Sequence, residues 1–167
     1  MRKLIILCAV VLLLSAGAVS AQDESVGFKG WGPRVGLTLD PDQIHFGAHA
    51  DFGNFAKHLR FQPNFEIGFG DDFTIAMLNA EVNYRFSEKW DVWTPYLGGG
   101  VGIAFINHDF PDNANGHGDD TNTEFGASVL GGIEKGLSNG DRFFLEVKLG
   151  LVDAPDLKIT AGWTFGH

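Results

Sequence analysis

The chain has 167 residues, and its 21 acidic residues against 12 basic ones give a net charge of −9. Binding to nucleic acid needs a basic surface, so we expect no nucleic-acid partner. The length suits one domain. Hydrophobic residues make up 44% of the chain, but beyond the first 21 residues they alternate with polar ones instead of forming long runs.

The first 21 residues are typical of a secretory signal peptide. Met1-Arg2-Lys3 gives a positive start, residues 4–14 are apolar, and Val19-Ser20-Ala21 is a small-residue cleavage site. The apolar run is shorter than the roughly 20 residues of a spanning helix. The single cysteine, Cys8, lies within it, so the mature chain has no thiol chemistry. Cleavage leaves 10 basic residues against 21 acidic ones, a charge of −11. We predict a signal peptide over 1–21, a short lead over 22–30 and one barrel domain over 31–167.

The stretch Arg142–Leu151 shows the pattern that organises the rest of the chain. Strand side chains alternate between two faces, so one face here carries only Phe, Leu and Val. The other face holds Arg142, Glu146 and Lys148 together with Phe144 and Gly150. An apolar face opposite a face of charges and glycines indicates a small closed barrel that is greasy outside and polar inside.

Eight strands with this alternation follow one another, separated by turn residues. They are Trp31–Leu39, Ile44–Phe52, Leu59–Phe69, Thr74–Phe86, Val92–Ile106, Thr123–Leu137, Arg142–Leu151 and Leu157–Phe165. The pattern predicts an all-β fold, an eight-stranded antiparallel up-and-down transmembrane β-barrel.

Alternation alone does not say which face is inside, because a soluble lipocalin-like carrier of an apolar ligand also alternates. Two features favour the membrane barrel. Glycines such as Gly36, Gly98 and Gly162 concentrate on the charged face, where an eight-stranded interior leaves little room. The aromatic residues of one rim form an expected girdle at a membrane interface: Trp31, Tyr84, Trp90, Trp93 and Trp163.

Three segments carry a resemblance to a known group of proteins. Thr94-Pro95-Tyr96-Leu97-Gly98-Gly99-Gly100-Val101-Gly102 resembles a central strand, and Phe125–Gly132 followed by Arg142–Leu151 and Lys158–Phe165 resembles closing hairpins, of the small outer-membrane β-barrels. These form the broad superfamily of outer-membrane proteins A, X and W. The resemblance implies export to the outer membrane of a Gram-negative bacterium, insertion by the barrel-insertion machinery and contact with lipid and lipopolysaccharide. We further expect a monomer.

An even strand count places both termini at one end, which the resemblance implies is periplasmic, together with the aromatic girdle. The connections at the other end, which follow the first, third, fifth and seventh predicted strands, contain many aspartates and no Lys or Arg. The one long connection, Asn107–Asn122, is the expected site of any contact with an extracellular partner. Its candidate residues are His108, Asp109, Phe110, Asp112, His117, Asp119 and Asp120.

The inward face combines charges of both signs. Its bases are Arg34, Arg60, Arg85, Arg142, Lys148 and Lys158, and its acids are Asp51, Glu66, Glu81, Glu134 and Glu146. Because an isolated buried charge is costly, we expect these residues to pair and to plug the lumen. The candidate network comprises Arg34, Arg60, Glu66, Glu81, Arg85, Arg142, Glu146 and Lys148. A narrow gated channel is the second alternative.

Catalytic and metal-binding motifs are not found in the sequence. The outer-connection histidines His108 and His117 have no neighbouring serine for lipid hydrolysis. His45 and His49 share a strand face about 13 Å apart, too far for one metal ion, and we expect them to fill the lumen. We therefore expect no enzyme activity, no metal and no cofactor.

Overall fold

The computed structural model describes residues 26–40, 42–70, 73–108, 121–152 and 157–166. The predicted signal peptide, Met1–Ala21, and the first part of the predicted lead lie outside these ranges. The remainder of the lead runs along the end of the second strand, since Gly27 and Lys29 donate backbone hydrogen bonds to the carbonyls of Phe52 and Asp51.

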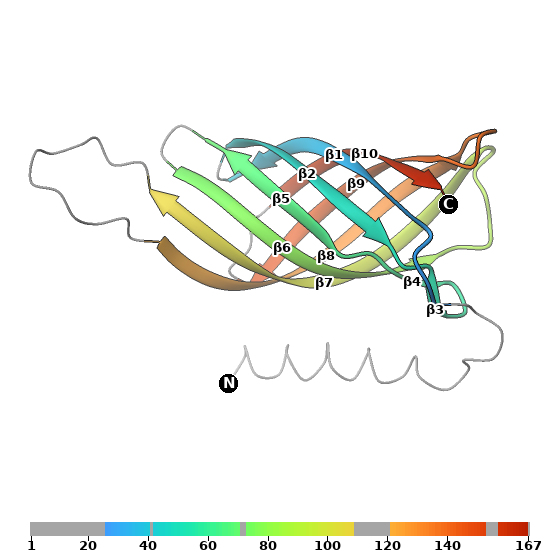
Figure 1. The fold of residues 1–167 in the computed structure, drawn as a ribbon, viewed down its shortest axis with the longest axis horizontal. Coiled ribbons are helices and arrows are strands. Elements are labelled where there is room, and N and C mark those ends of the chain that lie inside the picture. The colour runs from blue at the N-terminus through green and yellow to red at the C-terminus, as the bar shows by residue number, and fades with distance from the viewer. Residues whose placement is uncertain (1–25, 41, 71–72, 109–120, 153–156, 167) are drawn as a thin grey trace, which may run out of the picture.

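The described residues form ten strands, all paired antiparallel (Figure 1). They are β1 (Gly30–Leu39), β2 (Gln43–Asp51), β3 (Asn54–Ala56), β4 (Leu59–Phe61), β5 (Asn64–Phe69), β6 (Phe73–Arg85), β7 (Trp93–His108), β8 (Thr121–Gly136), β9 (Arg142–Val152) and β10 (Leu157–Gly166). The predicted strands agree with these bounds to within one or two residues, apart from the third.

The sheet closes on itself. β2 pairs with β5, and β4 and β5 both pair with β6. From β6 to β10 each strand pairs with the next in sequence, and β1 pairs with β2 and with β10, in a register that sets Leu37 against Ile159. With β4 and β5 counted as two parts of one wall strand and the short β3 left outside the ring, eight strands complete it. Each of these eight wall strands, as far as the structure describes them, has a partner on both sides, which is the condition for a β-sheet in lipid. The predicted eight-stranded antiparallel up-and-down barrel is confirmed.

The third predicted strand, Leu59–Phe69, was wrong as a continuous element. It divides into β4 and β5 at Gln62 and Pro63. Pro63 has no N–H to donate, and the surrounding ladder gives way to single bonds from Ala50 N to Pro63 O and from Gln62 N to Glu81 O. The connection between the second and third predicted strands, residues 53–58, contains a further strand, β3, which forms a short hairpin with β4.

The distribution of side chains is the reverse of that in a soluble protein: polar side chains are buried and large apolar ones are exposed. Charged and amide side chains such as Arg34, Glu66 and Asn83 are at most 3% exposed. Large apolar side chains on the opposite face, such as Leu37 and Leu78, are 52% and 55% exposed. The predicted parity therefore holds around the barrel, with the apolar face outward.

The barrel has two distinct ends. The terminal end carries both ends of the barrel domain, the β3–β4 hairpin and the short β6–β7 and β8–β9 connections (Figure 1). The loop end carries the β1–β2, β5–β6, β7–β8 and β9–β10 connections. The site described below is the interior between these two ends.

Candidate functional site

A central charge network crosses the middle of the lumen. Its hub is Arg34 of β1, whose guanidinium pairs with Glu66 at 3.0 Å and with Glu146 at 2.7 Å, and approaches Glu81 at 3.8 Å. Lys148 pairs with Glu81, and Lys158 pairs with Glu66. The network therefore contains three cations and three carboxylates, and its net charge is zero.

An apolar layer of Tyr96, Leu130 and Phe144 lies beside this network, toward the terminal end. Phe144 precedes Glu146 on the inward face of β9, and its ring packs under the guanidinium of Arg34, 5.6 Å from Cζ to the ring centroid. The same ring lies over Gly162, where an added Cβ would come within 2.2 Å of it. The hydroxyl of Tyr96 donates a hydrogen bond of 3.0 Å to Glu146, so the layer is tied to the central network.

A second charge network lies at the terminal end of the lumen. It is an alternating series from Arg85 to Glu134, Arg60, Asp51 and Arg142. Arg85 and Arg60 pair with the two oxygens of Glu134, Arg60 at 2.7 Å. Arg142 pairs with Asp51 at 2.5 Å, and Arg60 approaches the same oxygen at 3.7 Å. We call these five residues the mouth network.

Polar side chains without charge fill the remaining wall positions. His45 is hydrogen-bonded to Thr38 and Thr160, each at 3.0 Å, and His49 to Thr164 at 2.8 Å. The two predicted lumen histidines thus lie in the interior. The amide pairs Asn79–Asn64 and Asn83–Gln62 complete this wall.

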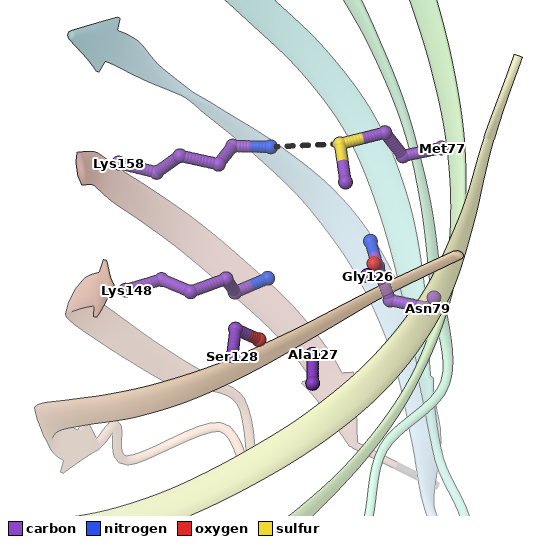
Figure 2. A pocket seen from close by; sticks show the side chains of 8 residues that line it. Met77, Asn79, Gly126, Ala127, Ser128, Lys148 and Lys158 are labelled. Carbon is purple, nitrogen blue, oxygen red and sulfur yellow. Dashed lines mark hydrogen bonds between the residues drawn. The ribbon is translucent and has the colours of Figure 1, made fainter. Parts of the chain in front are cut away.

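The lumen is less uniformly polar than predicted from the sequence. Toward the loop end, Ile75, Met77 and Ala104 form a buried apolar cluster. Below it, Lys148 and Lys158 reach from β9 and β10 toward Met77 and Asn79 on β6 (Figure 2). The cavity between them measures about 10 Å³, room for about one water molecule. The alternation of side chains along β6 and β8 places Ile75, Met77 and Leu130 inward. They were not predicted as interior residues because apolar residues were expected mainly on the outward face.

Every residue of the predicted network lies inside the barrel, but in two separate groups. Arg34, Glu66, Glu81, Glu146 and Lys148 belong to the central network. Arg60, Arg85 and Arg142 belong to the mouth network, whose carboxylates Asp51 and Glu134 the candidate set omitted.

The predicted aromatic girdle residues gather at the terminal end. Trp31 begins β1 and Trp163 is near the end of β10, while Tyr84 and Trp93 flank the β6–β7 connection that contains Trp90. Trp93 and Trp163 each make an edge contact with the ring of Phe143, at 6.3 and 6.2 Å between centroids.

Trp163 also donates an indole hydrogen bond of 3.1 Å to Asp141 in the β8–β9 connection. This bond, with further ones from Gly166 N and Asn139, holds the pKa of Asp141 below its ordinary value.

The predicted surface-interaction residues fall mostly outside the described residues. His108 ends β7. The others, Asp109, Phe110, Asp112, His117, Asp119 and Asp120, lie within the β7–β8 connection that the structure does not describe.

Two further observations limit the chemistry of the described part of the chain. It contains no group of three or more His, Cys, Asp or Glu side chains placed to hold a metal ion. It also contains no helix long and apolar enough to cross a membrane.

Comparison with solved structures identifies the architecture. The crystal structure of Neisserial surface protein A (NspA) matches with a TM-score of 0.66 and 15% identity, covering 87% of this chain and all of that one. The N-terminal β-barrel domain of Pseudomonas aeruginosa OprF matches with a TM-score of 0.54 and 13% identity over the same shares. The chain has the fold of the small outer-membrane β-barrels. The resemblance found in the sequence is confirmed at the level of the fold. No protein-family model and no curated protein sequence matches this small barrel.

Proposed function

We propose that the protein is an integral outer-membrane β-barrel with a sealed lumen, and that its role is structural or one of surface interaction, without catalysis. The single observation that carries this proposal is the inverted distribution of side chains on a closed sheet. A continuous belt of half-exposed Leu, Val, Ile and Phe side chains surrounds an interior of paired charges. Lipid acyl chains are the environment that such a belt requires.

The interior supports a plugged barrel over the two alternatives. A lipocalin-like carrier needs an apolar cavity that is open to its ligand, whereas here the apolar belt faces outward and the inward positions are held by ion pairs. A channel needs a continuous wet path with charges of one sign left available. The central network is instead neutral, with Arg34 at its hub, and the apolar layer of Tyr96, Leu130 and Phe144 lies against it.

The membrane orientation follows from the aromatic girdle and the resemblance. We place the terminal end in the periplasm and the acidic loop end outside, where Asp residues would meet lipopolysaccharide through cations or a partner through its basic groups. The 107–122 connection remains the candidate surface for an extracellular partner. Export through the Met1–Ala21 signal, insertion by the barrel-insertion machinery, a Gram-negative outer membrane and a monomeric state are parts of the same proposal.

The proposal is tested with the mature chain refolded into lipid vesicles and examined before and after boiling on a denaturing gel. We expect a folded band that migrates faster when unboiled and that requires lipid or detergent to form. Planar-bilayer recordings of the same preparation should show no steady conductance. A monodisperse folded protein without detergent would contradict the membrane assignment, and a steady conductance would contradict the sealed lumen.

A further inference from the structure

The mouth network differs from the central network in its charge balance. Arg60, Arg85 and Arg142 face only Asp51 and Glu134 within it, so the group carries one positive charge in excess. The central network carries none. An uncompensated charge in a partly enclosed site costs free energy unless a counter-charge is supplied.

The excess charge lies where a ligand can reach it. The alternating series ends in an arginine on both sides. The side chain of Arg85 is 31% exposed and that of Arg142 is 18% exposed, whereas those of Arg60, Asp51 and Glu134 are at most 4% exposed. Solvent at the terminal end therefore meets guanidinium groups, with the two carboxylates beneath them.

Two donors in this group lack a hydrogen-bond partner. The Nε atoms of Arg60 and Arg85 are buried and make no hydrogen bond within the described structure. Asp51 is already engaged on both oxygens, because Oδ1 accepts the Gly53 amide at 2.7 Å and Oδ2 binds Arg142. Glu134 accepts a hydrogen bond from Arg60 on Oε2, and its Oε1 pairs with Arg85 as an ion pair alone. Asp51 therefore has no oxygen left for the remaining N–H groups.

The neighbouring acidic residue does not neutralise the mouth. Asp141 precedes Arg142 in the β8–β9 connection, and its oxygens accept hydrogen bonds from Trp163, Gly166 and Asn139. Arg142 instead points inward to Asp51 across the lumen.

We propose that the mouth network is a binding site for an oxyanion, a phosphate-like group held by the partly exposed guanidinium groups of Arg85 and Arg142. Guanidinium groups donate hydrogen bonds in a planar fork that suits phosphate oxygens. One bound anion would extend the alternation of charges and balance the excess. The phosphate belongs either to a phospholipid headgroup at this rim or to a soluble molecule that enters the mouth.

The experiment titrates inorganic phosphate into the detergent-folded mature protein, with chloride replaced to keep ionic strength constant. The arginine Nε–H resonances in ¹H–¹⁵N NMR spectra are followed. Those of Arg60 and Arg85 should shift saturably in the wild type. Arg142→Gln should weaken phosphate affinity by about tenfold, the loss expected for one charge-assisted hydrogen bond. Arg142→Lys, which keeps the charge, should bind more tightly than Arg142→Gln.

Lys89→Gln is the matched control, since Lys89 is an exposed base in the β6–β7 connection at the same end. It should leave the titration unchanged. Unsaturable shifts, or equal affinities for the wild type and Arg142→Gln, would overturn the proposal. Arg85→Gln gives the same test at the more exposed end of the series if Arg142→Gln fails to fold.

A second arm separates the two sources of phosphate. The protein is folded into vesicles of phosphatidylcholine with or without phosphatidylglycerol, in phosphate-free buffer. A shift of the same resonances by phosphatidylglycerol, lost in Arg142→Gln, assigns the site to lipid. Saturable binding of inorganic phosphate without a lipid effect assigns it to a soluble anion. If neither phosphate nor phosphatidylglycerol shifts the resonances in a protein that folds into vesicles and does not conduct, the oxyanion site is refuted while the proposed function stands.

Discussion

The outward face of β6 provides a quantitative test of membrane insertion. Leu78 is 55% exposed and lies between the outward-facing Phe65 of β5 and Ile103 of β7. Tyr84 of the aromatic girdle is six residues further along the same strand. At roughly 3.3 Å per residue and a tilt of about 40°, this spacing puts Leu78 about 15 Å above the girdle, near the middle of the apolar band.

We predict that Leu78→Arg makes folding into lipid vesicles less favourable by about 2–4 kcal/mol, the cost of arginine at the bilayer midplane. Tyr84→Arg, at the interface, should cost no more than about 1 kcal/mol. The measurement is reversible denaturant titration in vesicles, followed by tryptophan fluorescence. Equal costs at the two positions, or no cost at Leu78, would refute the reasoning that depth in lipid sets the energy.

Three further predictions concern the lumen, the rim and the long connection. Glu81→Gln and Lys148→Met should each destabilise the folded barrel by about 3–5 kcal/mol, and the double variant by less than the sum, because each single change leaves a buried charge unpaired; denaturant titrations giving additive costs would mean independently solvated charges. The depressed pKa of Asp141 means that this residue stabilises the fold above the ordinary aspartate pKa, and that the stabilisation is lost as the pH falls through the depressed pKa. Asp141→Ala should remove this contribution, so acid titration of Trp163 fluorescence should lose one transition. Replacing 108–120 by a Gly-Ser turn should leave the heat-modifiable gel shift intact and remove any surface binding, while calorimetry on the wild type should give a calcium affinity no better than about millimolar; loss of folding would show that the connection is structural.

The parity of the sequence was sufficient to predict the barrel and the composition of its two faces. Alternation over β6 or β9 depends only on the two-residue period of a strand, which is local information. The break at Pro63 was also visible as a proline within a strand pattern, a residue that removes a ladder donor. The strand was nevertheless predicted as continuous, because the alternation of apolar and polar residues continues across Pro63 without a shift.

The pairing of charges could not be predicted in the same way. Arg34 reaches Glu146 across the lumen from a position 112 residues away. Which carboxylate it meets depends on the stagger of the strands around the barrel, which no local pattern records. The division into a neutral central network and a positively charged mouth follows from that stagger. The position of the apolar layer of Tyr96, Leu130 and Phe144 beside the central network follows from the same stagger.

The most direct test of the central claim is site-directed spin labelling in vesicles. The predicted mature chain contains no cysteine, so single cysteines can carry a nitroxide at Leu78, Asn79 and Ala80 of β6. We predict that labels at Leu78 and Ala80 are relaxed strongly by oxygen, which concentrates in lipid, and weakly by a water-soluble nickel complex. The label at Asn79, in the packed lumen, should respond weakly to both. High nickel accessibility at Leu78 and Ala80 would contradict a lipid-facing belt, and high nickel accessibility at Asn79 would contradict a sealed interior.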